Sequence, residues 1–148
     1  MPTRWRLTTA SCSSGPGTMQ APPWESVHLS DEGLTFQAQT LGVREAYAEF
    51  GLQAPALHKE PDDHIGLELA FLGQLAVAAL TSGEAGDVGA QGAVLAAMTQ
   101  FLHEHLLMWA PEFARLTTAA AQTPLYRAVG ELLAGALGWL AELLPDQS

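Results

Sequence analysis

The feature that most constrains this fold is a long apolar segment, residues 65–80, headed by the sequence Glu60-Pro61-Asp62-Asp63-His64. Free N–H groups and the macrodipole favour acidic residues at a helix N-terminus, and proline suits the first helical position. The pattern therefore predicts a helix over about 61–80. Its apolar residues fall on nearly all sides, which is typical of a central, buried helix. Capping does not account for His64.

Helical periodicity continues through most of the chain, and no stretch alternates as a strand would. A helix is expected to end at Gly51, a preferred residue just past helix ends, and another to end before Pro111, since the residue preceding proline disfavours helical geometry. The further expected helices span about residues 35–50, 91–108, 111–121 and 124–144. The fold class is therefore all-α, a helical bundle.

The segments outside these helices have turn and loop character. Residues 24–34 are expected to be extended, with a turn at Asp31-Glu32-Gly33. Residues 1–23 are rich in Ser, Thr, Gly and Pro, which predicts a loop or disorder. This leaves residues 24–148 as the helical domain. In its last helix the glycines at 130, 135 and 138 are expected to permit close helix packing.

Composition limits the partners of the chain. Its 148 residues suit one domain with a real core, and 48% hydrophobic with 15% charged residues indicates a globular protein. The net charge of −10 disfavours nucleic-acid binding and suits a basic partner. Cys12 is the single cysteine, so no intramolecular disulfide forms and a reducing compartment is the simpler interpretation.

No membrane span or secretory signal is expected. The closest candidate span is Leu125–Leu144, and Arg127, Glu131 and Glu142 interrupt it. The N-terminus has basic residues without an apolar segment behind them. We therefore expect no stable membrane insertion.

Catalytic and metal sites are also not expected. His103 and His105 lie about 200° apart on a helix and cannot share a face, while His64 and Glu68 at i, i+4 are too few ligands for a site. No nucleophile elbow or phosphate-binding loop is present in the sequence. The sequence thus predicts no enzyme, metal or cofactor.

Three segments carry a family resemblance. The sequence Glu60-Pro61-Asp62-Asp63-His64 resembles the Glu-Pro-x-Asp-His motif of the TorD/DmsD/NarJ-type chaperones, which mature redox enzymes. Residues 15–17 with 21–27 look like the hinge segment of that family, and residues 124–132 look like its last helix. The resemblance runs from about Gly15 to the C-terminus. Met1–Ser14 is not family-like, and the resemblance implies a bundle truncated at its N-terminus.

The resemblance implies a function. Such a chaperone is cytoplasmic, binds the twin-arginine signal peptide (the leader) of a client enzyme, and aids its cofactor insertion and maturation. The implied partner is the apo form of the catalytic subunit of a molybdopterin-dependent reductase of the DMSO/TMAO type. Two alternatives stay open: a NarJ-like assembly chaperone of a reductase that is not exported, and a truncated helical interaction module without leader binding.

The resemblance also implies which residues bind the leader. Asp63 and His64, with Glu60, match the motif, and carboxylates pair well with arginine. Pro23 and Trp24 would form a rigid apolar wall for the leader's hydrophobic stretch. The remaining candidates are His28, Phe36 and Gln37, where His28 replaces a common aromatic and Gln37 departs from the glycine of some members.

A structural role is the alternative for each of these residues. Asp63 could cap the helix, His64 could pack beneath the connector, and the hinge could pack on the bundle. Because the N-terminal helices of the family are missing, apolar helix faces would also lack partners. We therefore expect self-association, by exchange of helices between protomers.

Overall fold

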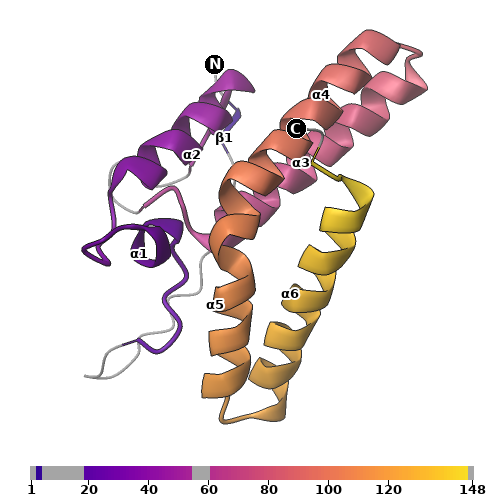
Figure 1. Cartoon of the computed structure of the whole chain (residues 1–148). Coiled ribbons are helices and arrows are strands. Elements are labelled where there is room, and N and C mark those ends of the chain that lie inside the picture. Colours follow the sequence, from indigo (N-terminus) through magenta and orange to yellow (C-terminus); the bar gives the residue numbers. More distant parts are fainter. Residues whose placement is uncertain (1–2, 5–18, 55–60, 147–148) are drawn as a thin grey trace.

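The computed structural model describes residues 3–4, 19–54 and 61–146, which form an all-α bundle (Figure 1). Its helices are α1 (Glu25–Leu29), α2 (Ala38–Glu49), α3 (Ile65–Glu84), α4 (Val88–Phe101), the π-helix η1 (Leu102–Leu106), α5 (Leu107–Ala120) and α6 (Pro124–Leu143). Two-residue strands β1 (Thr3–Arg4) and β2 (Leu52–Gln53) pair in parallel. The predicted fold class is confirmed, while most of the loop expected over 1–23 lies outside the described residues.

The helices form two hairpins that share one continuous helical segment, residues 88–120, which we call the rod (Figure 1). Helices α3 and α4 pack together as the first hairpin, and α5 and α6 pack as the second. Helix α4, η1 and α5 follow one another without a break and change direction near η1, so one rod contributes to both hairpins. Helices α1 and α2 lie on the other side of this rod.

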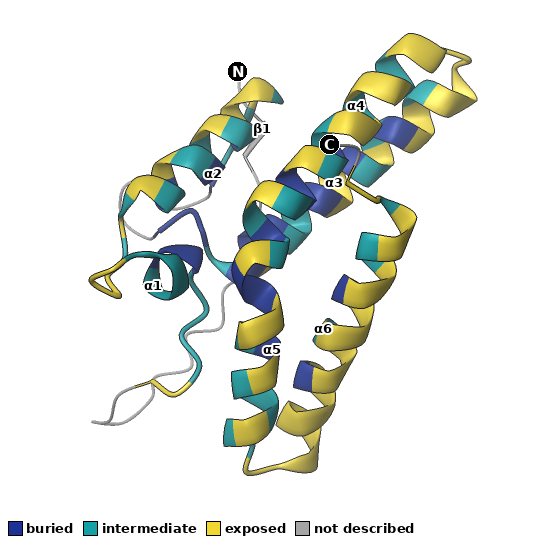
Figure 2. Ribbon diagram, viewed as in Figure 1, coloured by how far each residue is buried: buried dark blue, intermediate teal, exposed yellow. Residues whose placement is uncertain are grey.

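The core lies where α2 and α3 meet the continuous helical segment of α4, η1 and α5 (Figure 2). Tyr47 and Phe71 have ring centroids 4.9 Å apart, and Phe71 and Phe101 pack edge-to-face at 4.7 Å. From α6, Leu137 reaches this cluster. The hydrophobic core is thus built mainly from aliphatic side chains, and Tyr47, Phe71, Phe101 and Trp109 are its aromatic members.

Helix α3 is buried only in part, which corrects the expectation of a wholly buried helix. Its first half enters the core, but Val77 and Leu80 near its other end are exposed because no described element lies over them. By length and composition α3 could also cross a membrane, although 39% of its apolar window is buried and core helices pass the same test. By length and composition, α3 is therefore a better candidate for a membrane span than the predicted segment 125–144.

Two helix starts differ from the sequence prediction. The predicted helix over 61–80 begins at Ile65, and His64 is its N-cap, with Nδ1 accepting the Gly66 N–H at 3.0 Å. Capping therefore does account for His64, although histidine is not among the usual cap residues. Between residues 24 and 34, α1 replaces the expected extended segment.

The C-terminal end of α2 agrees with the prediction. The helix stops at Glu49, and Gly51 follows with φ of +66°, a left-handed conformation that glycine adopts without steric cost. Its start lies at Ala38, three residues later than the expected Thr35.

The prediction that a helix ends before Pro111 is wrong. The rod runs through Pro111, which lies inside α5, one turn after η1. Proline removes one backbone donor and crowds the preceding turn. A π turn and a proline are both recognised causes of a local bend, and placed together they let the helix continue with a changed direction.

Helices α5 and α6 approach closely at one glycine. A Cβ on Gly130 would lie 2.3 Å from the Thr118 hydroxyl and 3.0 Å from the Ala114 carbonyl oxygen, so only glycine fits. The packing role predicted for Gly135 and Gly138 is wrong, since a Cβ at either position meets nothing within 4 Å among the described residues.

The start of α6 offers a stability test. Pro124 occupies the first turn as predicted, and Thr123 caps the helix by accepting the Tyr126 N–H. Changing Thr123 to alanine should lower the free energy of unfolding by about 0.5–1 kcal/mol, because that donor loses its partner. Urea unfolding measures the change. Thr123→Ser keeps the hydroxyl and should stay within about 0.3 kcal/mol of the wild type; an equal loss in both variants would contradict a capping role.

Candidate functional site

Three helix starts meet at Asp63. Its Oδ2 accepts the Ser26 N–H in the first turn of α1 at 2.7 Å, and its Oδ1 accepts the Thr40 hydroxyl in the first turn of α2 at 2.9 Å. Asp63 itself lies two residues before α3 and is fully buried. One carboxylate thus faces the partly positive N-terminal ends of neighbouring helices. We call this arrangement the Asp63 junction.

Most of the predicted motif residues gather around the Asp63 junction. The backbones of residues 23–25 and 63–65 pair antiparallel, with the Ile65 N–H donating to Pro23 O at 2.9 Å and the Glu25 N–H donating to Asp63 O at 3.0 Å. The rings of Trp24 and His64 meet edge-to-face, with centroids 5.8 Å apart. The structure therefore joins Pro23, Trp24, Asp63 and His64 from two separate segments.

The remaining predicted residues are more scattered. His28 donates from Nε2 to Pro22 O at 2.8 Å, and its ring packs at a tilt against Trp109, with centroids 5.2 Å apart. Gln37 is the N-cap residue of α2, as Trp24 is of α1, but neither side chain makes a capping hydrogen bond. Glu60 lies outside the described residues.

Phe36 has an unusual backbone. Its φ of +60° is a left-handed conformation, and it is the single non-glycine residue with positive φ in the described part of the chain. Its side chain is half exposed. Such a conformation costs about 1–3 kcal/mol in a non-glycine residue and is found preferentially at functional sites, which supports Phe36 as a candidate binding residue.

Asp62 forms a second buried polar group beside the junction. Its Oδ2 accepts from Arg44 Nε, and its backbone carbonyl accepts the Tyr47 hydroxyl at 3.1 Å. Its other carboxylate oxygen is buried without a hydrogen-bond partner among the described residues. Burial, with the neighbouring acidic charges of Glu68 and then Asp62, raises the pKa of Tyr47 well above its ordinary value. Tyr47 therefore stays a neutral donor.

Glu68 and Glu25 complete the buried acidic set. Glu68 Oε2 accepts the Trp109 indole N–H at 3.2 Å, and His105 Nδ1 lies 3.1 Å from both carboxylate oxygens of Glu25. Burial raises the pKa of Glu68 well above its usual range, the charge of Glu25 raises it further, and the Trp109 hydrogen bond opposes both. Glu68 therefore keeps its proton to a higher pH in the folded chain than an exposed glutamate does.

Sequence analysis missed most partners of these acids: Ser26, Thr40, Arg44, Tyr47, His105 and Trp109. They come from α1, α2, η1 and α5, far apart along the chain. One signal was present, since Glu68 is the single charged residue between Ile65 and Leu80. A lone acid in a buried apolar helix requires hydrogen-bond partners.

A small hollow lies between α2 and the rod, next to His105. It has a volume of about 250 Å³, with Phe50, Phe71 and Phe101 among its lining residues. The carboxylates of Glu45, Glu49 and Glu104 also line it, as does His105, which contacts Glu25. We call it the α2–η1 hollow, and its combination of aromatic rings and carboxylates suits a cationic side chain.

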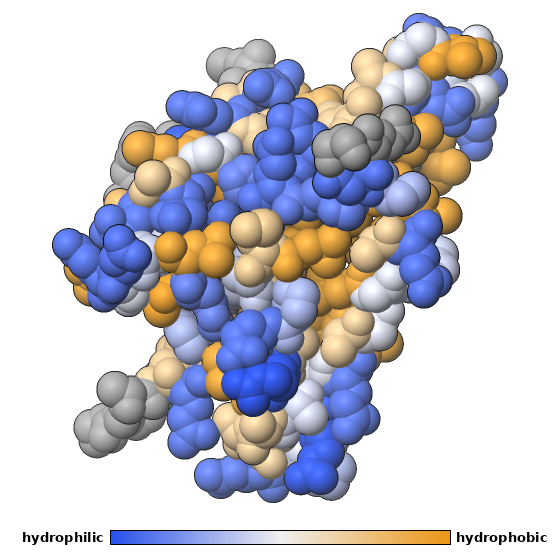
Figure 3. All heavy atoms as spheres, in the orientation of Figure 1, coloured by the Kyte–Doolittle hydropathy of each residue, from blue (hydrophilic) through white to orange (hydrophobic). Residues whose placement is uncertain are grey.

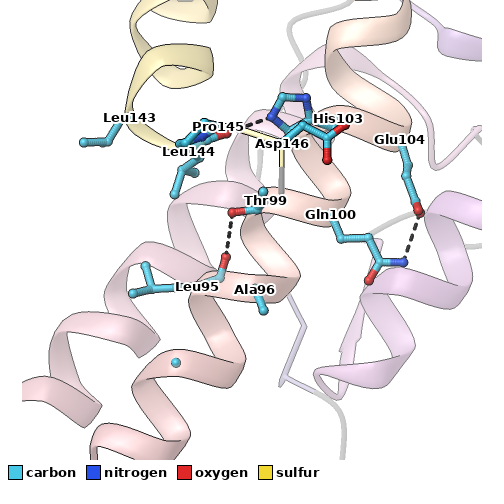
Figure 4. A pocket seen from close by; sticks show the side chains of 11 residues that line it. Leu95, Ala96, Thr99, Gln100, His103, Glu104, Leu143, Leu144, Pro145 and Asp146 are labelled. Atoms are coloured by element: carbon cyan, nitrogen blue, oxygen red, sulfur yellow. Dashed lines mark hydrogen bonds between the residues drawn. The ribbon is translucent and has the colours of Figure 1, made fainter. Parts of the chain in front are cut away.

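A larger hollow of about 620 Å³ lies between α4, η1 and the C-terminal end of α6 (Figure 4). His103 Nε2 donates to Leu144 O at 2.7 Å across it, and Gln100 donates to Glu104 at 3.1 Å (Figure 4). None of the predicted leader-binding residues lines this hollow or the α2–η1 hollow.

The two histidines of the sequence His103-Glu104-His105 make separate contacts. His103 contacts the end of α6 while His105 contacts Glu25, so the two rings diverge as their spacing predicts. In the described ranges, no three His, Cys, Asp or Glu side chains are grouped to hold a metal ion.

Comparisons with known proteins identify the family. The family model described as nitrate reductase delta subunit matches residues 13–115, which include the Asp63 junction. The chain is 32% identical over 131 residues to the Tat proofreading chaperone DmsD of Salmonella typhi, covering 88% of this chain and 57% of that protein. It is 31% identical over 119 residues to the chaperone protein TorD of Aliivibrio fischeri, covering 80% and 54% respectively.

The chain spans about half the length of the curated relatives it matches. The family match nevertheless extends over most of the chain, and the relatives carry the chaperone names that the Glu60–His64 motif suggested. The chain therefore belongs to the nitrate reductase delta subunit family, the TorD/DmsD/NarJ-type family of redox-enzyme maturation chaperones.

Proposed function

We propose that this chain is a cytoplasmic chaperone that binds the twin-arginine leader on the apo catalytic subunit of a molybdopterin-dependent reductase. In this role it would hold the client while the cofactor is inserted, and then release it for export. The family and the names of its relatives, a Tat proofreading chaperone and TorD, support this assignment. The net charge of −10 favours encounter with a cationic leader.

The observation that carries the proposal is the α2–η1 hollow. An arginine side chain can stack its planar guanidinium on an aromatic ring while a carboxylate accepts its hydrogen bonds. Phe50 supplies a partly exposed ring, and Glu45 and Glu49 are exposed acidic residues on the same hollow. We therefore place one arginine of the leader in this hollow.

Asp63 has a different role in this proposal. It is fully buried and both carboxylate oxygens already accept hydrogen bonds, so it positions Trp24 and α1 instead of meeting the leader. His64 and Trp24 are partly exposed and pack edge-to-face. Together with Pro23 they would contact the apolar stretch that follows the arginine pair.

Calorimetric titration with a synthetic twin-arginine leader tests the proposal. Saturable binding is expected, and Glu45→Gln with Glu49→Gln should weaken it about tenfold, because two charge-assisted partners are lost. A matched control, Asp31→Asn with Glu32→Gln, removes the same charge from an exposed turn and should change the affinity less than about twofold. An equal loss of affinity in both double variants would show that only the net charge matters, which would contradict an arginine site in this hollow.

The variant Phe36→Gly extends the same titration. Phe36→Gly removes a half-exposed ring and relieves the left-handed strain, so binding should weaken while the fold is retained. A leader with both arginines replaced by lysine should bind less tightly, because lysine cannot bond carboxylates in a bidentate manner. No binding by the folded wild-type chain would reject the proposal.

One observation favours a second candidate function. The matching family model is described as a nitrate reductase delta subunit, which suits a NarJ-like assembly chaperone of a reductase that is not exported. Such a chaperone would bind an N-terminal client peptide that lacks the arginine pair. Titration with that peptide beside the twin-arginine leader distinguishes the two functions by which peptide binds more tightly.

A further inference from the structure

His105 lies between the buried acids and the α2–η1 hollow. Its Nδ1 is 3.1 Å from both carboxylate oxygens of Glu25, the first residue of α1. The imidazole also packs at a tilt against Phe101, with ring centroids 4.9 Å apart. The side chain of His105 is 17% exposed, whereas that of Glu25 is 2% exposed. A buried carboxylate therefore holds one nitrogen of this ring in place.

The contact with Glu25 determines which nitrogen of neutral His105 carries the hydrogen. An ionised carboxylate only accepts hydrogen bonds, so Nδ1 must donate to Glu25. Glu68 supports this assignment: burial, and then the charge of Glu25, raise the pKa of Glu68, and the two carboxyl groups hydrogen-bond each other. Glu68 is therefore the member of this acid pair that keeps its proton. With the hydrogen on Nδ1, the other ring nitrogen, Nε2, is an acceptor.

The acceptor nitrogen of His105 lies on the side of the hollow. A Cβ on Gly42 of α2 would be 3.2 Å from Cε1 and 3.8 Å from Nε2 of the imidazole, and Gly42 and His105 both line the hollow. Nε2 forms no hydrogen bond with any residue in the described ranges. This nitrogen is therefore open to a ligand that enters the hollow.

The charged groups that face His105 are all acidic. In the described ranges they are Glu25 of α1, Glu68 of α3, Glu45 and Glu49 of α2, and Glu104 of η1 itself. The α4 residues that line the hollow, Ala97, Gln100 and Phe101, are uncharged. Figure 3 shows hydrophilic residues at the surface where α2 approaches the rod. Within the described part of the chain, His105 is thus the one lining residue that can carry a positive charge.

We propose that neutral His105 accepts a hydrogen bond through Nε2 from the leader arginine in the α2–η1 hollow. This inference rests on the proposed function and adds a binding residue to that site. Glu45 and Glu49 supply negative charge, whereas the imidazole supplies a directional acceptor that Glu25 holds in position. A guanidinium presents a planar fork of N–H donors, so it can bond a carboxylate and the imidazole together.

The same geometry links leader binding to the release of a proton. Protonated His105 carries hydrogen on both nitrogens, so Nε2 becomes a donor and the ring repels the guanidinium. Histidine side chains ordinarily change charge between about pH 5 and 8. When the leader binds a chain in which His105 is protonated, the arginine takes the place of that proton, which passes to the buffer. Leader affinity should therefore increase as the pH rises through this range.

Calorimetric titration with the twin-arginine leader, in buffers of different ionisation enthalpy, counts the released protons. His105→Asn keeps a donor near the position of Nδ1 for Glu25 but removes both the acceptor and the titration. At its maximum between about pH 5.5 and 8, the wild type should release at least about 0.3 proton more per leader than His105→Asn. At about pH 8 the variant should bind roughly 3–10-fold more weakly, because one hydrogen bond to a charged group is lost.

His103→Gln is the matched control. His103 belongs to the same π-helix but donates to Leu144 O in the larger hollow (Figure 4), and glutamine keeps a donor for that oxygen. This variant should release as many protons as the wild type and keep its affinity within about twofold. Equal proton release by the wild type and folded His105→Asn would overturn the role of His105 while leader binding stands. No binding by the folded wild type would instead reject the proposed function itself.

Nitrogen-15 NMR of the imidazole groups provides a measurement on the unaltered chain. Above its titration, His105 should show the tautomer with hydrogen on Nδ1, because Glu25 accepts from that nitrogen. Adding the leader should move the titration midpoint of His105 to lower pH. A hydrogen on Nε2 in the neutral form, or a midpoint that the bound leader leaves unchanged, would overturn the inference.

Discussion

Asp63→Ala is expected to lower the free energy of unfolding by about 3–5 kcal/mol, the largest effect we expect for a single side chain here. The change removes the acceptor of the Ser26 N–H and of the Thr40 hydroxyl and leaves both donors in a buried site. A hydrogen bond to a charged group contributes about 1.5–3 kcal/mol, and an unsatisfied buried donor costs a similar amount. Losing this carboxylate also removes the group that links the starts of α1 and α2.

Urea unfolding followed by circular dichroism measures this loss. Asp63→Asn keeps one acceptor oxygen and should lose about half as much stability as Asp63→Ala. Asp31→Ala, in an exposed turn, should stay within about 0.5 kcal/mol of the wild type. An unfolding midpoint unchanged in Asp63→Ala would contradict the structural role. Leader binding by this variant is informative only where the variant remains folded.

Glu68→Gln is expected to stabilise the chain at neutral and alkaline pH. Burial and the charge of Glu25 raise the pKa of Glu68 in the folded state well above the ordinary value of 4.5. Between these two values the folded chain holds a proton that the unfolded chain has lost, so raising the pH destabilises the wild type. Glutamine has no proton to lose and still offers an oxygen to the Trp109 indole.

The difference between Glu68→Gln and the wild type should therefore grow with pH. It should increase by up to about 1.4 kcal/mol per pH unit above the unfolded pKa and level off above the raised folded pKa. Urea unfolding at pH 5, 6, 7 and 8 provides the measurement. Glu84→Gln, exposed at the other end of α3, serves as the matched control. A difference independent of pH would show that Glu68 is ionised in both states.

Local sequence patterns predicted the helices well where local chemistry decides them. The start of α6 at Pro124 follows from a proline after a capping threonine, and the end of α2 follows from Gly51. The start of α3 was misplaced because acids and a proline mark a helix N-terminus by composition, whereas a histidine served as the cap. The proline rule failed at Pro111, which lies inside α5 one turn after η1, because a proline can bend a helix without ending it.

The candidate site was predictable only in part. The motif picked out Asp63 and His64, but Asp63 bonds to Ser26 and Thr40, which lie 37 and 23 residues away along the chain. No spacing rule relates residues that meet only through tertiary packing. Composition could likewise not show that the carboxylates of Asp62 and Asp63 turn inward, because acids are ordinarily exposed.

The short π-helix has a thermodynamic consequence. Within three residues it places His103 against the last turn of α6 and His105 against Glu25 beside the α2–η1 hollow. A ligand that favours one geometry of η1 would therefore act on both contacts at once.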